Sequence, residues 1–249
     1  MLDRMFKTLR AFWLANAKAS RGGSTLELPG VAAAIVPAMP DRSVVSCVMY
    51  DEAADLERQL DRIDAAYRDA GVLAWTVWVH ESDQRAQAAL SAAGNVLDAE
   101  PMGQARELDG MEGPADGELD LVPNPSPADF DPVVEGAYGW PGFADAMPAF
   151  PEGFHPYLAL LDGRPACCLG TFDCDGDTGI QLVGTVPEAR GRGLAGRLLT
   201  KALVDARDRG CTTTTLQATA MGYPVYSRLG YRDIGRIQMW ERRMSASPG

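Results

Sequence analysis

The chain has 249 residues, of which 46% are hydrophobic, and it carries a formal net charge of −11. This length suits one large domain or two small ones, and the apolar content is enough for a packed core. The negative charge argues against nucleic acid or an anionic membrane as the main partner, because phosphate groups would be repelled. We therefore expect no nucleic-acid partner and no membrane partner.

The N-terminal stretch 1–21 mixes aromatic and leucine side chains with Lys and Arg. It lacks an uninterrupted apolar core and a convincing cleavage site, so we interpret it as an amphipathic first helix rather than a signal peptide. No stretch approaches the ~20 apolar residues of a membrane span. The five cysteines are odd in number and form no C-x-x-C pair, which indicates reduced thiols and a cytoplasmic protein. With only two histidines, we expect no metal site.

The first half of the chain alternates strand and helix patterns. Short β-branched and apolar runs predict strands, and apolar residues at helical spacing predict helices. In chain order we expect one or two strands over 26–36, a strand over 43–50, a helix over 51–70, a strand over 74–80, a helix from 82 or 83 to 93, and a strand over 95–99.

An acidic segment separates the two halves. Between Asp98 and Asp131 the acidic residues face a single base, Arg106, and Pro and Gly are frequent. We interpret this segment as a linker or a long solvated surface, with the linker itself over 111–127. The alternative is that its acids repel anions or attract a cationic substrate.

The second half begins with two helical patterns, over 128–138 and 142–150. Turn signals then predict hairpins, and strand and helix patterns follow to the end of the chain. We expect strands over 157–161, 164–172 and 180–186, a helix over 194–209, a strand over 211–218, a helix over 222–229, a strand over 233–242 and a disordered tail over 245–249. The acids at 173, 175 and 177 resemble a calcium loop, but Thr178 and Gly184 occupy its sixth and twelfth positions, so we reject that site.

A glycine-rich turn joins the expected strand 180–186 to the helix that follows. Exposed backbone amides at a helix start form an anion site, and Arg190, Arg192 and Arg197 add positive charge there. A pyrophosphate fits such a turn. The alternative is that these basic residues, together with Lys201, form a solvated helix face that binds no ligand.

The glycines of this turn also match the dinucleotide fingerprint G-x-G-x-x-G, at 191, 193 and 196. In a dinucleotide fold, however, the strand runs almost directly into the first glycine and an acid ends the next strand. Here four residues (187–190) intervene, and the next strand ends near Gln217 and Thr219. A nicotinamide oxidoreductase is therefore the weakest of our alternatives.

Two motifs together point to a known family. Val186-Pro187-Glu188-Ala189 followed by Arg190-x-x-Gly193-x-Ala195 closely resembles the acetyl-CoA loop of the GCN5-related N-acetyltransferases, the GNAT superfamily. Downstream, residues 223–231 (YPVYSRLGY) resemble the Y-x-x-L-G-F/Y segment of the same superfamily. The resemblance covers about the last half of the chain.

This resemblance implies an α/β (α+β) fold, with a mixed, mostly antiparallel sheet flanked by helices. Residues 90–97 mirror the pattern that follows Tyr226, so the two halves resemble a tandem in which the C-terminal copy is complete and the N-terminal copy is degenerate. We expect a degenerate domain over 1–110, a linker over 111–127 and a catalytic domain over 128–249. An unrelated N-terminal cap with a chance similarity is the alternative.

The resemblance also implies site residues. Tyr226 matches the superfamily tyrosine that protonates the leaving thiolate, and a backbone amide near Val186 would face the oxyanion. Acetyl-CoA, the cosubstrate, would be bound by residues of the strand end and the turn: Gly184, Thr185, Val186, Arg190, Gly191, Arg192, Gly193, Leu194, Ala195 and Gly196. No motif identifies the base; the candidates are Glu135, Asp145, Glu152 and Asp173, or a water chain.

The expected function is an acetyl-CoA-dependent N-acetyltransferase acting on an amine of a small molecule or a protein. The alternative is a non-catalytic protein that keeps an acetyl-CoA site for sensing or assembly. The sequence leaves open whether the protein forms a homodimer.

Overall fold

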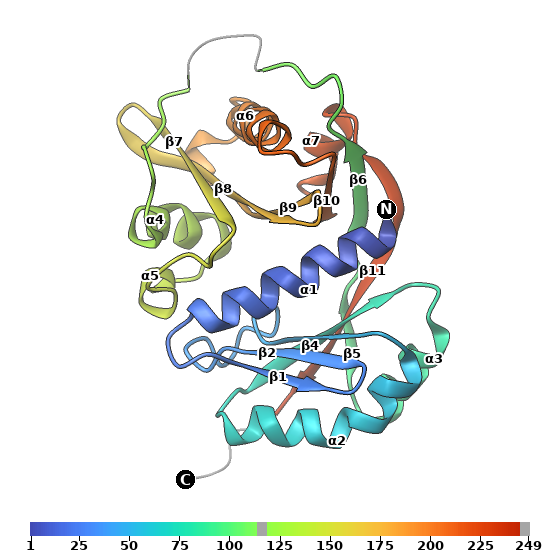
Figure 1. Ribbon diagram of the computed structural model, residues 1–249. Helices are drawn as coiled ribbons and strands as arrows, with labels where there is room; N and C mark the ends of the chain where they lie inside the picture. The colour runs from blue at the N-terminus through green and yellow to red at the C-terminus, as the bar shows by residue number, and fades with distance from the viewer. Residues whose placement is uncertain (114–118, 245–249) are drawn as a thin grey trace. The chain divides into compact units, whose positions relative to one another are not determined.

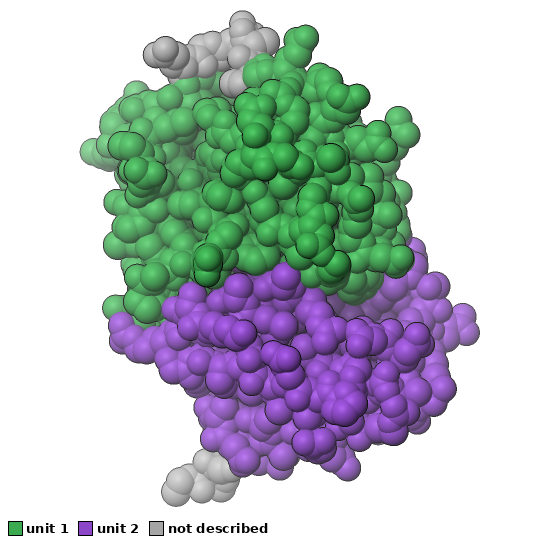
Figure 2. All heavy atoms as spheres, viewed as in Figure 1, with its two compact units in different colours: residues 1–9, 103–234 green, residues 10–102, 235–249 purple. Residues whose placement is uncertain are grey.

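A computed structural model of the chain describes residues 1–113 and 119–244. The expected disordered tail and part of the expected linker therefore lie outside the described residues. The chain divides into two compact units (Figure 2). Unit 1 comprises residues 1–9 and 103–234, and unit 2 comprises residues 10–102 together with the described residues from 235 onward. Mixed sheets flanked by helices confirm the predicted α/β class (Figure 1).

Unit 1 holds most of the second half of the chain. Its elements are the start of α1 (Leu2–Ala19), β6 (Met102–Glu107), α4 (Pro127–Tyr138), α5 (Phe143–Ala146), β7 (Phe154–Leu161), β8 (Arg164–Cys174), β9 (Asp177–Thr185), α6 (Leu194–Asp208), β10 (Thr213–Ala218) and α7 (Tyr223–Arg228). Its strands lie in the order β6-β10-β9-β8-β7. β7, β8 and β9 form an antiparallel meander, and β10 joins β9 in parallel.

Helices α6 and α4 cover opposite faces of this sheet (Figure 1). On one face Tyr157, paired with Leu169, donates a hydrogen bond to Asp205 of α6. The next residue along β8, Cys168, pairs with Gly184, which lies against Val133 of α4. Successive residues of a strand face opposite sides, so α6 and α4 enclose the strands between them.

Unit 2 is built from the first half of the chain and its end. Its elements are the rest of α1, β1 (Ser24–Leu28), β2 (Val31–Ile35), β3 (Cys47–Tyr50), α2 (Ala53–Asp69), β4 (Ala74–His80), α3 (Gln84–Ala92), β5 (Val96–Ala99) and the greater part of β11 (Arg232–Arg243). The strands lie in the order β1-β2-β3-β4-β11, and β5 also pairs with β11. β3 and β4 are parallel and are connected by α2, and the other pairs are antiparallel.

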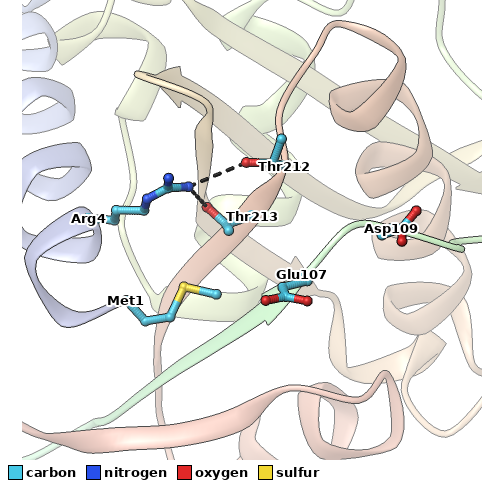
Figure 3. Close-up of a pocket in the computed structure, with 6 residues that line it drawn as sticks. All are labelled: Met1, Arg4, Glu107, Asp109, Thr212 and Thr213. Carbon is cyan, nitrogen blue, oxygen red and sulfur yellow. Dashed lines mark hydrogen bonds between the residues drawn. The ribbon is translucent and has the colours of Figure 1, made fainter.

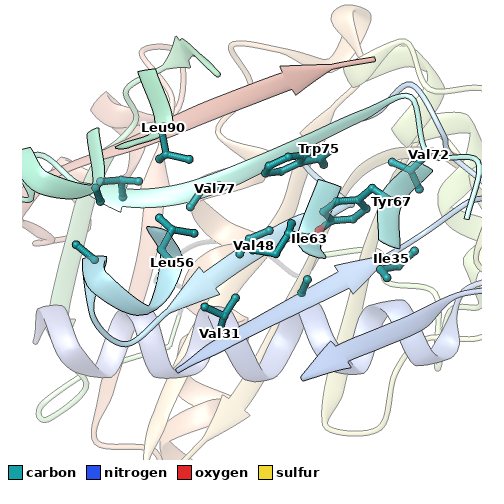
Figure 4. Close-up of a cluster of buried hydrophobic side chains, with 14 residues drawn as sticks. Val31, Ile35, Val48, Leu56, Ile63, Tyr67, Val72, Trp75, Val77 and Leu90 are labelled. Carbon is teal, nitrogen blue, oxygen red and sulfur yellow. The ribbon is translucent and has the colours of Figure 1, made fainter. Parts of the chain in front are cut away.

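The core of unit 2 fills the space between α2 and this sheet (Figure 4). Leu56, Ile63 and Tyr67 follow helical spacing and are all fully buried. The ring of Tyr67 stacks on Trp75 of β4 with centroids 5.1 Å apart, and its hydroxyl donates to the Ala34 carbonyl at 3.1 Å. The hydroxyl therefore keeps a partner although the ring is buried.

Two strand assignments differ from expectation. β6 falls in the segment that we predicted as part of the acidic surface, because Gly103, Gln104 and Ala105 carry no β-branched signal although all three are buried. β11 begins in unit 1, and from Gly235 onward it belongs to unit 2, where it pairs with β4. The expected domain boundaries at 110 and 127 stay a prediction. Among the described residues, no helix has the length and apolar character needed to cross a bilayer.

Candidate functional site

Strands β9 and β10 pair only at one end. Their parallel register covers Asp177–Gly179 of β9 and Thr213–Thr215 of β10. Beyond this point β9 continues to pair with β8, with a register shift between Cys168 and Gly170. Leu182, opposite this shift, has a φ of 52°, which a side-chain-bearing residue rarely adopts and which is typical of a bulge. The rest of β9 thus has an edge that β10 does not cover.

The backbone groups of β9 alternate between β8 and this open edge. The Val186 amide donates to the Ala166 carbonyl at 3.0 Å, so Val186 faces β8. Thr185 and Val183 are one and three residues away, so their backbone groups face the open edge. The Val186 amide itself is therefore engaged within the sheet, and the expectation that an amide near Val186 faces an oxyanion stays a prediction.

The glycine-rich turn leads from this edge into α6. Pro187–Ala189 form one 3₁₀ turn, and Gly191 and Gly193 have φ values of 76° and 73°, which favour glycine. Gly193 is the N-cap of α6, and no side chain caps the helix. Neither Gly191, Gly193 nor Gly196 has any atom within 4 Å of where a Cβ would lie, so this backbone borders open space.

An uncapped helix start presents amide donors and the positive end of the helix dipole, so it favours an anion. The side chains of Arg190 and Arg192 are exposed beside it, and Arg190 Nε donates to the Thr185 carbonyl at 3.2 Å. Lys201, which the sequence grouped with these arginines, instead forms an ion pair with Asp205 at 2.6 Å. The positive charge at the turn therefore comes from the arginines.

Tyr226 lies on α7 and is 7% exposed. Its ring packs edge-on against Tyr231 with centroids 5.8 Å apart, and the Tyr231 hydroxyl shares a hydrogen bond of 2.9 Å with Thr214. Burial raises the pKa of Tyr226 well above 10, and nearby Cys167 adds to the rise. The phenol is therefore held in its protonated form at neutral pH.

One residue of this region was not predicted as a site residue. Tyr138 is the last residue of α4, which starts with a capping box between Ser126 and Asp129 and ends at Gly139, with φ 67°. Its hydroxyl donates to the Val183 carbonyl at 2.7 Å, on the open edge of β9. The feature of the sequence that could have indicated it is the pair of aromatic residues, Tyr138 and Trp140, on either side of the glycine that ends the helix.

The family model described as an acetyltransferase (GNAT) domain matches residues 177–234, which span β9, the turn, α6, β10 and α7. A GCN5-related N-acetyltransferase from Kribbella flavida is 17% identical, with a TM-score of 0.68, over 98% of this chain and 96% of that one. Together these matches show that the chain has the GNAT fold.

Two further solved structures with the GNAT fold match nearly the whole chain. A putative GNAT-family acetyltransferase from Novosphingobium aromaticivorans is 16% identical, with a TM-score of 0.61, over 95% of this chain and 98% of that one. A tandem GNAT protein from the clavulanic acid biosynthesis pathway is 15% identical, with a TM-score of 0.58, over 99% and 97%. Among curated protein sequences, none matches the chain. The predicted resemblance to the GNAT superfamily is confirmed. At these sequence identities, the structural similarity shows a shared fold.

In unit 2, the start of the helix that corresponds to α6 carries acidic side chains. Its helix between parallel strands, α2, occupies the place that α6 has between β9 and β10. The N-cap of α2 is Glu52, and Asp55 lies in its first turn. Carboxylates there repel phosphate. This agrees with the expected degenerate first half, which has no counterpart to the loop 190–195.

The four carboxylates suggested as a catalytic base do not form one group. Asp173 accepts hydrogen bonds from Arg209 at 2.7 Å and from Thr178 at 2.6 Å, so its lone pairs are used. Glu135, Asp145 and Glu152 are exposed. Among the described residues, no group of three or more His, Cys, Asp or Glu side chains could hold a metal ion.

A pocket of about 450 Å³ in unit 1 lies away from these residues (Figure 3). It is lined by Met1, Arg4, Glu107, Asp109, Thr212 and Thr213. The Arg4 guanidinium donates to Thr213 at 3.2 Å and to Thr212 at 3.4 Å. None of these lining residues belongs to the glycine-rich turn, the open edge of β9 or α7.

Proposed function

We propose that this protein transfers an acetyl group from acetyl-CoA to an amine of a small molecule or a protein. The observation that carries the proposal is the junction of two features: an uncapped N-terminus of α6 and a β9 edge that β10 leaves open. The first fits a pyrophosphate and the second fits an extended amide chain. Coenzyme A has both groups, in that order along its length.

The residues present fit this cosubstrate. The amides from Gly191 to Gly196 would hold the two phosphates, and Arg190 and Arg192 would balance their charge. Leu194 and Ala195 contribute backbone in the first turn of α6. Along β9, Thr185 would offer its backbone groups to the pantetheine arm, whereas Gly184 and Val186 face β8 and shape the wall beside it.

Acetyl-CoA, when bound, supplies a thioester whose carbonyl carbon an amine nitrogen can attack. The amine would add to this carbon to give a tetrahedral intermediate, and its proton would pass to the base or to a water chain. As the C–S bond then breaks, Tyr226 would give its proton to the leaving thiolate. The raised pKa of Tyr226, caused first by burial and then by Cys167, keeps that proton available at neutral pH. The amide of Val183, which faces the open edge, would be the amide near Val186 that stabilises the carbonyl oxygen.

The acceptor is proposed as an amine because the similar Kribbella flavida protein is named an N-acetyltransferase, and the amine must be neutral to attack the thioester. The bonds from Arg209 make Asp173 poorly suited as the base, so we propose Glu135, Asp145, Glu152 or a water chain for this role. We further propose that the protein is cytoplasmic, that it has no nucleic-acid or membrane partner, and that it is a monomer or a homodimer.

The experiment is thiol release from acetyl-CoA in the presence of a panel of amines. Tyr226→Phe removes the proton donor, and Tyr223→Phe is the matched control, since Tyr223 lies on the same short helix and its hydroxyl binds Asp233 at 3.0 Å. We expect kcat to fall about 100-fold or more in Tyr226→Phe and to stay within about twofold in Tyr223→Phe. CoA binding by the wild type with no turnover on any amine would support the sensor instead.

A further inference from the structure

Tyr138 occupies the end of the open β9 edge that lies farthest from the phosphate site. The edge begins at the bulge around Leu182 and runs through Val183 and Thr185 to the glycine-rich turn. A donor whose phosphates lie at the start of α6 would extend back along Thr185 and place its acyl end beside Val183. The Val183 carbonyl is the group that the Tyr138 hydroxyl binds, at 2.7 Å.

The same side chain belongs to the cluster that contains Tyr226. Burial raises the pKa of Tyr138 well above 10, and the ionisable neighbours that add to this rise are Cys168, Tyr226 and Cys167. The residue is 38% exposed, and its hydroxyl is bonded to the Val183 carbonyl. The ring is thus held at its hydroxyl end, and part of its surface is accessible.

The ring is also fixed from behind. A Cβ at Gly184 would lie 3.1 Å from the Ala137 Cβ and 3.3 Å from Tyr138 Cε2, so α4 contacts β9 closely where glycine stands. Trp140 also packs against the ring, with ring centroids 5.3 Å apart and planes at 30°. With its hydroxyl bonded and its ring packed, Tyr138 has little freedom to yield to a larger neighbour.

We propose that Tyr138 limits the length of the acyl group that the site accepts, so that acetyl fits and longer chains collide with its ring. This rests on the proposed function, because it assigns the acyl class of the same donor. Tyr138 is a specificity-determining residue in this proposal: the hydroxyl bond to Val183 holds the ring in place, and the ring closes the end of the edge.

The test compares acetyl-CoA, butyryl-CoA and free CoA by calorimetry in the wild type, Tyr138→Ala and Tyr138→Phe. Leu97→Ala, a similar truncation of a side chain 42% exposed on β5 of unit 2, is the control. We expect the wild type to bind butyryl-CoA about tenfold or more weakly than acetyl-CoA, since each added methylene must find room. Tyr138→Ala should reduce this ratio to about threefold or less, and Tyr138→Phe and Leu97→Ala should leave most of it in place.

Free CoA reports the integrity of the phosphate site, because it carries no acyl group. Equal affinity of the wild type for the two acyl donors, or an unchanged ratio in Tyr138→Ala with normal CoA binding, would overturn the role of Tyr138 alone. No binding of CoA or of either acyl donor by the wild type would overturn the proposed function together with it.

Discussion

The ring of Tyr226 lies directly over the α-carbon of Gly222. A methyl group at Gly222 would lie 2.8 Å from Tyr226 Cε2 and 3.4 Å from its hydroxyl oxygen. Gly222 has φ −79°, which any residue adopts, so its need for glycine comes from Tyr226 and not from the backbone. We infer that this glycine positions the tyrosine.

Gly222→Ala should therefore displace the Tyr226 ring and lower kcat about tenfold or more, with the Kd for CoA changed by less than about threefold. The measurement is steady-state thiol release alongside calorimetry. Gly113→Ala is the control, because a Cβ there meets open space. A normal kcat in Gly222→Ala would show that the hydroxyl position does not matter.

A buried carboxylate closes the paired end of β9 and β10. Asp177 is 1% exposed and accepts hydrogen bonds from the hydroxyls of Thr8 at 2.8 Å, Thr213 at 2.8 Å and Thr215 at 2.7 Å. Thr215→Val keeps the shape and removes one donor, so the free energy of unfolding should fall by about 1.5–3 kcal/mol.

Urea unfolding measures this loss. The exposed neighbour Thr212 is the control, and Thr212→Val should change stability by about 0.5 kcal/mol or less. Equal effects of the two substitutions would contradict the assignment of Asp177 as a buried anchor for the strand junction.

The ionic cluster at the C-terminal end of α6 predicts a pH dependence of stability. Burial lowers the pKa of His155 below 6.5, and the Arg209 charge lowers it further, against the opposing effect of Asp173. Burial alone would raise the pKa of Asp173, but the hydrogen bonds from Arg209 and Thr178 outweigh it and bring the pKa below 3.8.

Both pKa values are lower in the folded state, so both contributions to stability are present at high pH and are lost on acidification. That of His155 is lost as the pH falls below 6.5, and that of Asp173 only below 3.8. Urea unfolding at pH 7.5 and at pH 5.5, about one unit either side of the His155 reference value, isolates the histidine. His155→Gln should flatten the decline over this interval, and an undiminished decline would assign it to other groups.

The parts of the site that were predictable from the sequence are those encoded locally. An anion-binding helix start was predictable from Gly191, Gly193 and the neighbouring arginines. Glycine favours positive φ values and has no side chain, and both are properties of single residues. Tyr226 was predicted by a motif of nine residues, 223–231, that forms one short helix and the turn after it.

The remaining features depend on register, which local patterns do not encode. The direction of the Val186 amide follows from the bulge at Leu182, and the part played by Tyr138 follows from how α4 packs on β9. β6 was missed because its buried side chains are small or polar. The Gln104 amide nitrogen donates to Asp233, at 2.8 Å, more than a hundred residues away. Pairings over such distances are fixed by tertiary structure.

The binding of CoA at the start of α6 is the central claim, and two glycines allow a matched test. Gly193 and Gly163 have φ values of 73° and 71°, and a Cβ at either would meet open space. An alanine at either position adds about 1–2 kcal/mol of backbone strain, but only at Gly193 does the backbone orient amides toward the phosphates. Calorimetry should show CoA bound by the wild type and by Gly163→Ala, and about tenfold or more weakly by Gly193→Ala. No heat of binding with the wild type, or equal affinities for the two alanine variants, would contradict the claim.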